Sequence, residues 1–136
     1  MRKIDKLIVH CSATPEGREV TTPEIDKWHR QRGFNSIGYH YVIYLDGTVH
    51  KGRHESIAGA HCKNYNRNSI GICYVGGLAK DGKTPKDTRT EAQKQSLIDL
   101  LKALKAKYPE ATIHGHREFA AKACPCFDAK YEYRNI

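Results

Sequence analysis

The chain has 136 residues, with a hydrophobic fraction of 39% and a charged fraction of 28%, which excludes a disordered or fibrous architecture and fits one domain over residues 1–136. Its longest apolar runs are only a few residues, so the sequence predicts no membrane insertion. The net charge of +8 favours a polyanionic partner such as nucleic acid, an anionic membrane or a bacterial wall polymer, without choosing among them.

A short apolar run near the start of the chain, LIVHC at residues 7–11, predicts a buried strand. His10 lies near the end of this strand. Because side chains alternate between the two faces of a strand, His10 and Cys11 point in opposite directions and are not expected to bind one metal ion together. A lone histidine at this place is equally well explained as a hydrogen-bonded core residue, so His10 by itself does not establish a site.

The next element is a helix whose two ends are marked in the sequence. Thr22, with Pro23 at the first helical position, predicts the start, and Gly33 predicts the end. Proline is tolerated at this start because the first N–H groups of a helix have no partner inside it. Ile25 and Trp28 are expected to face inward.

Residues 38–52, GYHYVIYLDGTVHKG, predict a β-hairpin. Its turn is Asp46-Gly47, a dipeptide that tolerates the positive φ angles of tight hairpin turns. Tyr39 falls at the entry of the first hairpin strand. A further β-rich run follows at residues 69–75, SIGICYV, and the segment after it has the composition of a loop.

A long helix is predicted to begin at Thr90, where Gln93 three residues later completes a capping box. Pro109 is expected to end it, and a short strand is expected at residues 112–114. The apolar residues that recur at helical spacing are Leu97, Leu100, Leu101 and Leu104. Because strands alternate with helices, we predict an α/β fold, a single domain with a mixed central β-sheet flanked by helices.

The segment HGHREFAAKACPCFD, residues 114–128, holds the densest group of potential metal ligands. His116 and Cys124 are separated by a loop long enough for both side chains to bend toward one ion. With His10 they make three protein ligands, which leave a tetrahedral zinc ion one open position for water, as in catalytic zinc sites. Lys122 stands beside Cys124. The pattern therefore favours metal-assisted hydrolysis.

Two features of this segment leave the ligand set open. Cys126 is as good a thiolate donor as Cys124, and the chemistry of the residues does not decide between them. His114 and His116 would share one face if the strand continued through Gly115, but a glycine makes that continuation doubtful.

The five cysteines follow no regular framework spacing. The start of the chain lacks an apolar region of signal-peptide length, so we expect a cytosolic protein with reduced thiols, in which metal binding or burial is favoured over disulfides. Cys62 and Cys73 are expected to be buried. A Cys-His nucleophilic site on Cys11 or Cys124 is a further alternative, ranked below zinc hydrolysis. The sequence contains no GxSxG, GxxxxGK[ST] or HExxH motif.

Five blocks of sequence, taken in order, carry a resemblance to a known family. They are HCSAT at residues 10–14, GYHYVI at 38–43, DGTV at 46–49, GAHCKNYNRNSIGICYVGG at 59–77 and GHREFAAKACPCFD at 115–128. With these blocks the chain resembles the zinc-dependent type 2 N-acetylmuramoyl-L-alanine amidases, and above all their phage lysozyme-amidase branch. This family shares its fold with the peptidoglycan recognition proteins.

The resemblance implies a role for each candidate ligand. It places one catalytic zinc ion on His10, His116 and Cys124. It prefers Cys124 to Cys126 because the family's ligand cysteine directly precedes the proline. The position of Cys126 usually holds a small residue without a thiol, so this chain departs from the family pattern there.

The resemblance also implies catalytic roles for Tyr39 and Lys122. Zinc supplies a water of lowered pKa and polarises the scissile carbonyl, Tyr39 handles a proton, and Lys122 stabilises the developing oxyanion. His61 lies in a segment that lines the cleft in the family, so we expect it to bind substrate. His40 alternates to the face opposite Tyr39 and is expected to be structural.

The implied substrate is peptidoglycan, cut at the amide between N-acetylmuramic acid and L-alanine. A phage or prophage endolysin would be made in the cytosol and act on the wall after release, whereas a muropeptide-recycling amidase would act in the cytosol. A non-catalytic peptidoglycan-binding module is the alternative from another functional class. Scattered basic residues make nucleic acid an unlikely main partner, a regulatory protein partner is not identifiable, and a monomer is expected.

Overall fold

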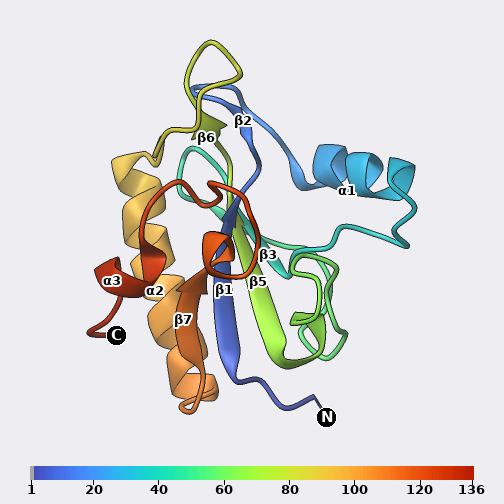
Figure 1. The fold of residues 1–136 in the computed structure, drawn as a ribbon, viewed down its shortest axis with the longest axis vertical. Helices are drawn as coiled ribbons and strands as arrows, with labels where there is room; N and C mark the ends of the chain where they lie inside the picture. Colours follow the sequence, from blue (N-terminus) through green and yellow to red (C-terminus); the bar gives the residue numbers. More distant parts are fainter. Residues whose placement is uncertain (1) are drawn as a thin grey trace.

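The computed structural model describes residues 2–136, which form a five-stranded sheet with strand order β4-β3-β5-β1-β7 (Figure 1). The strands of this sheet are β1 (Lys6–Cys11), β3 (Tyr41–Ile43), β4 (Val49–Lys51), β5 (Ser69–Tyr74) and β7 (Thr112–Gly115). All neighbouring strands pair in parallel except β3 and β4, which form an antiparallel hairpin. The short strands β2 (Thr14–Pro15) and β6 (Gly77–Leu78) form a separate parallel pair.

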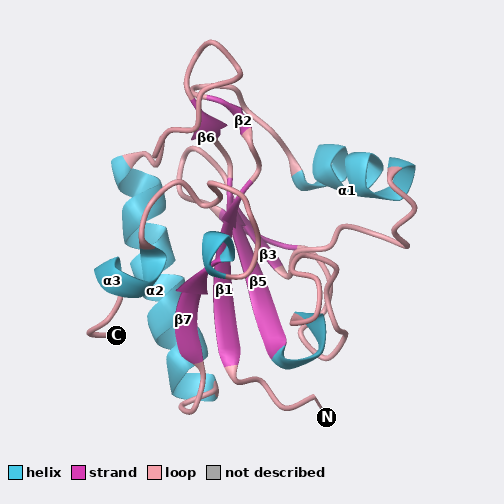
Figure 2. Cartoon of the chain, in the orientation of Figure 1, coloured by secondary structure: helices cyan, strands magenta, loops and turns pink. Residues whose placement is uncertain are grey.

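Helices pack against both faces of the sheet (Figure 2). They are α1 (Thr22–Gln31), α2 (Glu91–Lys107) and α3 (Ala129–Glu132), with 3-10 turns η1 (Asn66–Asn68) and η2 (His116–Glu118). One core cluster joins Leu97 and Leu101 of α2 to Leu7 and other residues of β1, β5 and β7. A second cluster joins Ile25 of α1 to Val42 and the opposite face of the sheet. The predicted mixed sheet with flanking helices is confirmed.

Alternation along β1 divides its side chains between these two clusters. Leu7, Val9 and Cys11 belong to the core under α2. His10 therefore points to the other face, the side on which α1 packs, and it is 1% exposed. The prediction that His10 and Cys11 face apart agrees with this arrangement.

The N-cap of the first helix lies one residue earlier than the sequence analysis predicted. Thr21, not Thr22, is the N-cap, because the Thr21 hydroxyl accepts a hydrogen bond from the N–H of Glu24 and the Glu24 side chain returns to the Thr21 N–H. Pro23 consequently occupies the second helical position. Gly33 has a φ of +95° and follows the last turn as expected, since glycine adopts this conformation without a steric penalty.

The long helix α2 begins as predicted and is tied to the sheet by its own cap. Thr90 and Gln93 exchange the two hydrogen bonds of a capping box, at 3.0 and 2.9 Å. The side-chain N–H of Gln93 also donates to the carbonyls of Ile43 and Val75, at 3.2 and 3.0 Å. Gln93 is fully buried, and its hydrogen bonds join the start of α2 to the end of β3 and to the residue that follows β5.

The predicted hairpin is present, and its turn follows the expected chemistry. The Tyr44 N–H donates to the Thr48 carbonyl at 3.0 Å, and Gly47 has a φ of +86°. Cys62 and Cys73 are buried as predicted. Across residues 2–136 none of the helices combines the length and the apolarity that crossing a bilayer would need.

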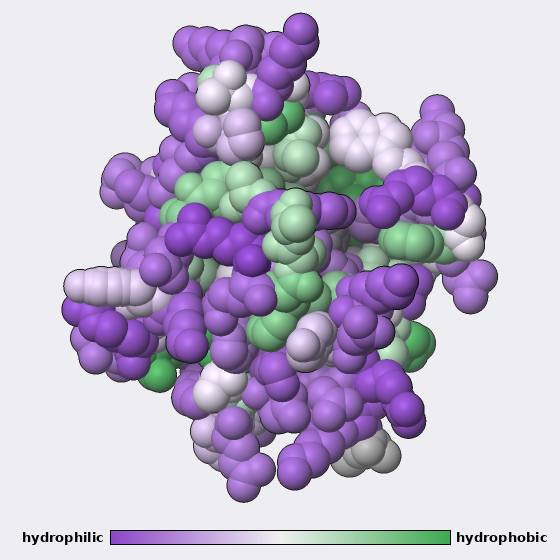
Figure 3. Space-filling view, viewed as in Figure 1, coloured by the Kyte–Doolittle hydropathy of each residue, from purple (hydrophilic) through white to green (hydrophobic). Residues whose placement is uncertain are grey.

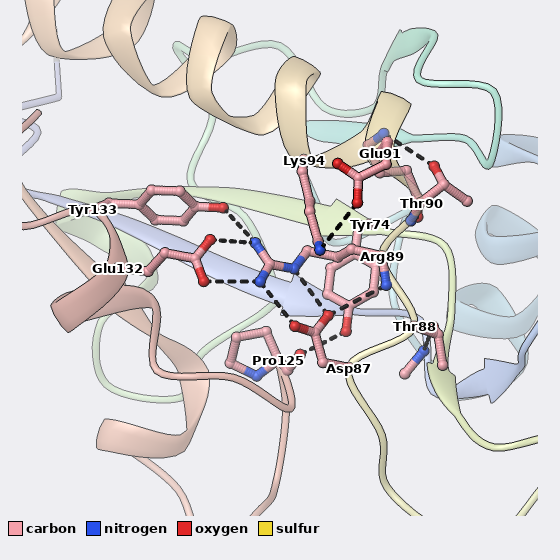
Figure 4. A network of polar contacts seen from close by, with 12 residues as sticks. Tyr74, Asp87, Thr88, Arg89, Thr90, Glu91, Lys94, Pro125, Glu132 and Tyr133 are labelled. Carbon is pink, nitrogen blue, oxygen red and sulfur yellow. Dashed lines mark hydrogen bonds and ion pairs between the residues drawn. The ribbon is translucent and has the colours of Figure 1, made fainter.

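A buried arginine fastens α3 to the segment that precedes α2 (Figure 4). Arg89 is 8% exposed and forms ion pairs with Asp87 at 2.8 Å and with Glu132 at 2.6 Å. Its guanidinium also donates to the Tyr133 hydroxyl at 2.8 Å and lies 3.4 Å from the centroid of the Phe127 ring. These contacts fix the end of the irregular segment that follows β7.

We expect Arg89→Ala to lower the free energy of unfolding by about 2–3 kcal/mol, because both carboxylates lose their counter-charge and a buried side chain is removed. The loss stays below that of a fully buried pair since Asp87 and Glu132 are partly exposed. Urea denaturation measures it. Lys94→Ala is the matched control, since it breaks the exposed pair with Glu91 and should change stability by less than about 0.5 kcal/mol. Equal effects would contradict the anchoring role.

Candidate active site

Parallel strand pairing brings His10 and His116 together. The register of β1 and β7 pairs Val9 with Gly115, so His10 and His116 are the next residues of adjacent chain segments at the same edge of the sheet. Their ring centroids are 4.5 Å apart. His116 opens the turn η2 and is half-buried, so one of the two rings lies in the core and the other at the edge of a cleft.

Cys124 completes a compact group of three donors. One ligand atom each from His10, His116 and Cys124 can be chosen so that all lie within 4.8 Å of one another. The Sγ atom of Cys124 is 3.9 Å from Nδ1 of His10. The backbone N–H of Cys11 donates to this sulfur at 3.1 Å, which holds the Cys124 side chain beside the end of β1. The arrangement is a possible metal site.

The second cysteine of the CPC sequence faces elsewhere. The thiol of Cys126 donates to the Gly77 carbonyl at 3.2 Å, and its sulfur is 4.0 Å from the sulfur of Cys11. Cys11 belongs to the core cluster under α2. The structure therefore places Cys124 with the two histidines and Cys126 against the opposite face of the sheet.

The strand at residues 112–114 was expected to stop before Gly115, and this expectation is wrong. β7 includes Gly115, because this residue pairs with Val9 of β1. A Cβ atom at Gly115 would lie 2.9 Å from Cδ of Pro125, so the glycine permits the close approach of Pro125. His114 still takes no part in the ligand group. Its ring nitrogens contact the Thr112 hydroxyl at 2.6 Å and Glu118 at 2.8 Å.

A cleft of about 620 Å³ opens beside these three residues. Figure 3 shows apolar side chains in a hollow beside α1, with hydrophilic side chains around it. Aromatic rings of Trp28 and Phe34 line the cleft, and so do the cationic side chains of Arg32, Lys63 and Lys122. Among the described residues that line it, none is acidic. The cleft therefore combines stacking surfaces with positive charge.

Tyr39 lies in the same cleft, packed between two imidazole rings. Its ring centroid is 5.1 Å from that of His10 and 5.3 Å from that of His29. Burial raises the pKa of Tyr39 well above its ordinary value, so the hydroxyl keeps its proton at neutral pH. His29 holds the backbone beside Tyr39, since its Nδ1 accepts the Gly38 N–H at 2.8 Å.

His29 is a cleft residue that the sequence reasoning did not identify. It is 6% exposed, and burial lowers its pKa to about 4, so the ring is neutral at pH 7. The available signal was its position four residues after Ile25 on the inward face of a helix. A histidine at such a position is not distinguishable from an ordinary core residue without the tertiary contacts.

Lys122 is exposed on the loop between η2 and Cys124, at the edge of the cleft. Burial and the charge of Lys122 together lower the pKa of His116. The lysine is therefore close enough to act electrostatically on the ligand group.

His61 is among the residues that line the cleft, and its role in substrate binding stays a prediction. It is only 9% exposed and lies behind His10, with its Nδ1 2.8 Å from Nε2 of His10. Burial and nearby His40 lower the pKa of His61 to about 3. His40 itself accepts the Gly71 N–H at 3.0 Å, which agrees with the structural role predicted for it.

A match to a known family assigns the chain to that family. The family model described as N-acetylmuramoyl-L-alanine amidase matches residues 1–127. The chain belongs to this family. It is an enzyme that hydrolyses the amide bond between N-acetylmuramic acid and L-alanine in peptidoglycan, as the resemblance in its sequence implied.

Similar proteins support the assignment. The endolysin of Escherichia phage T7 is 49% identical over 126 residues, which cover 93% of this chain and 83% of that protein. The structure of the amidase LysC from Clostridium intestinale superposes with a TM-score of 0.81 at 28% identity, covering 96% of this chain and 82% of the other. Drosophila PGRP-LB gives a TM-score of 0.81 at 25% identity over 99% of this chain and 82% of its own.

Proposed function

We propose that this amidase holds one catalytic zinc ion through His10, His116 and Cys124 and acts on intact peptidoglycan as an endolysin. The observation that carries the proposal is the group of three donor atoms within 4.8 Å at the floor of a cationic cleft. Two imidazoles and one thiolate are a donor set that suits zinc. When bound, zinc supplies Lewis acidity and a water of lowered pKa at neutral pH.

Tyr39 and Lys122 provide the remaining chemistry from the protein side. The Tyr39 hydroxyl keeps its proton, since burial raises its pKa, so it can donate a hydrogen bond to the leaving amine or to water. Lys122 brings a compact cation to the mouth of the same cleft, where it can stabilise the oxyanion that develops on the scissile carbonyl.

A complete donor set together with Tyr39 and Lys122 in one cleft favours catalysis over binding alone. A module that only bound wall fragments would not need two imidazoles and a thiol gathered beside a protonated phenol. Similarity to named endolysins over most of the chain supports the wall itself as the substrate.

The two cysteines of the CPC sequence give a matched test of the metal ligands. We expect wild type and Cys126→Ser to contain one zinc ion per chain, measured by mass spectrometry of the metal. Cys124→Ser should lose both zinc and wall-lytic activity, because its sulfur lies with the histidines. Retention of zinc by Cys124→Ser with loss in Cys126→Ser would move the assignment to Cys126, and lytic activity that survives chelation would rule out the metal mechanism.

We expect Lys122→Ala to lower kcat by about 10²- to 10³-fold with zinc content unchanged, because one stabilising group for the oxyanion is removed. Lys130→Ala is the control, since this exposed lysine lies on α3 and is not among the residues that line the cleft. Steady-state hydrolysis of a soluble muropeptide measures both. A wild-type rate in Lys122→Ala would remove the lysine from the mechanism.

The endolysin assignment is tested by comparing sacculi with soluble muropeptides as substrates. We expect new L-alanine amino termini to appear from intact sacculi, identified by mass spectrometry. Cys124→Ser, treated in the same way, gives the background. Cleavage of soluble muropeptides alone would show a recycling amidase instead.

A further inference from the structure

A chain of two hydrogen-bonding contacts runs from the back of the ligand group into the core. Nε2 of His10 is 2.8 Å from Nδ1 of His61, and Nε2 of His61 is 3.1 Å from the hydroxyl of Ser69. All three residues are buried, at 1%, 9% and 0% exposure. None of these contacts is needed for the roles given above to Tyr39 or Lys122.

The direction of the hydrogen bond between His10 and His61 follows from which ring nitrogen of His10 faces Cys124. This atom is Nδ1, at 3.9 Å from Sγ of Cys124. A neutral imidazole carries one proton, and a nitrogen that binds a metal must offer its lone pair. The proton of His10 therefore belongs on Nε2, where it is donated to Nδ1 of His61.

The second hydrogen bond, between His61 and Ser69, sets the tautomer of His61. Because Nδ1 of His61 accepts, its proton belongs on Nε2, which donates to the oxygen of Ser69. The neutral form of each ring is thereby specified by the next residue in the chain of contacts. With the opposite tautomer of His61, two N–H groups would face each other across 2.8 Å.

The fold provides a slot for the His61 ring. A Cβ atom at Gly71 would lie 2.6 Å from this ring, and one at Gly59 would lie 2.7 Å from its Cδ2 atom, so both glycines make room for the imidazole. The backbone is fixed as well, since Oδ1 of Asn66 accepts the N–H groups of His61 and Cys62, both at 2.9 Å. These contacts hold the ring in one orientation.

We propose that His61 is a positioning residue for the metal centre, which selects the Nε2–H tautomer of His10 and presents its Nδ1 lone pair to the ion, with Ser69 setting the tautomer of His61. The proposal rests on the zinc site proposed above. Outer partners of this kind typically change metal affinity by about 10- to 100-fold when they are removed. His61 thus acts on the metal through His10.

Two substitutions of His61 distinguish the effect of its hydrogen-bond acceptor from the effect of its aromatic ring. His61→Phe keeps an aromatic ring of similar size but removes the acceptor, and we expect the Kd for Zn²⁺ to rise about 10- to 100-fold. His61→Asn offers an oxygen close to the position of Nδ1 and should recover most of the affinity. Competition with a chromogenic chelator measures the Kd directly, without reference to activity.

Nitrogen-15 NMR of the histidine rings provides a second measurement, the tautomer of His10, which a general loss of stability does not change. In metal-free wild type we expect His10 to be held as the Nε2–H tautomer, and in His61→Phe we expect a mixture of both tautomers. Gln93→Leu is the control for lost stability, since Gln93 is fully buried and hydrogen-bonded but remote from the ligands. It should leave both the Kd and the His10 tautomer unchanged.

A folded His61→Phe with wild-type affinity and a single His10 tautomer would overturn the proposal. If His61→Phe does not fold, Ser69→Ala decides, because it leaves the His61 ring in place. We then expect a weaker Kd and a mixed His61 tautomer, and wild-type values for both would overturn it. Wild-type protein that binds no zinc would instead overturn the zinc site itself, which distinguishes the two failures.

Discussion

The parallel pairing of β1 with β7 is the constraint on which the site depends. It sets Val9 beside Gly115 and therefore places His10 and His116 at one edge of the sheet, although 106 positions separate them in the sequence. The same close approach requires glycine at position 115, because Pro125 packs where a side chain would be. The loop that carries Cys124 is consequently folded back over the ends of both strands.

Burial and the charges around the cleft favour neutral imidazoles in the ligand group. Burial lowers the pKa of His10 well below its ordinary value, and nearby His61, His116 and Lys122 act in the same direction. The pKa of His116 is lowered by burial and by Lys122. Neutral rings keep their lone pairs, so the cationic surface that suits an anionic wall polymer also keeps the histidines ready to bind a cation.

Local features of the fold were predictable because their causes are local. The capping box of Thr90 and Gln93 and the turn at Asp46-Gly47 depend only on residues close in the sequence, and both are present. The boundary errors have equally specific causes. At α1 two threonines are adjacent, and the spacing of Thr21 and Glu24 is the capping-box signal that identifies Thr21 as the cap.

The candidate site was less predictable because its decisive contacts join distant segments. Residue chemistry left Cys124 and Cys126 equivalent, and the family resemblance was needed to prefer one of them. Similarly, the position of His61 behind His10 arises from the pairing of β1 with β5, which brings Ser69 and its neighbours beside β1. A motif in a polar loop gave no sign that this histidine would be buried.

The same geometry accounts for the departure of this chain from its family at Cys126. The side chain points to the core face of the sheet, where its sulfur meets Cys11 and the Gly77 carbonyl. A Cβ atom at Gly77 would lie 2.4 Å from the sulfur of Cys11, so the space there is already closely filled. The contact with Cys11, together with burial, raises the pKa of Cys126 far above its ordinary value, which keeps it a neutral thiol. Cys126 therefore behaves as a packing residue, and its sulfur lies apart from the group formed by His10, His116 and Cys124.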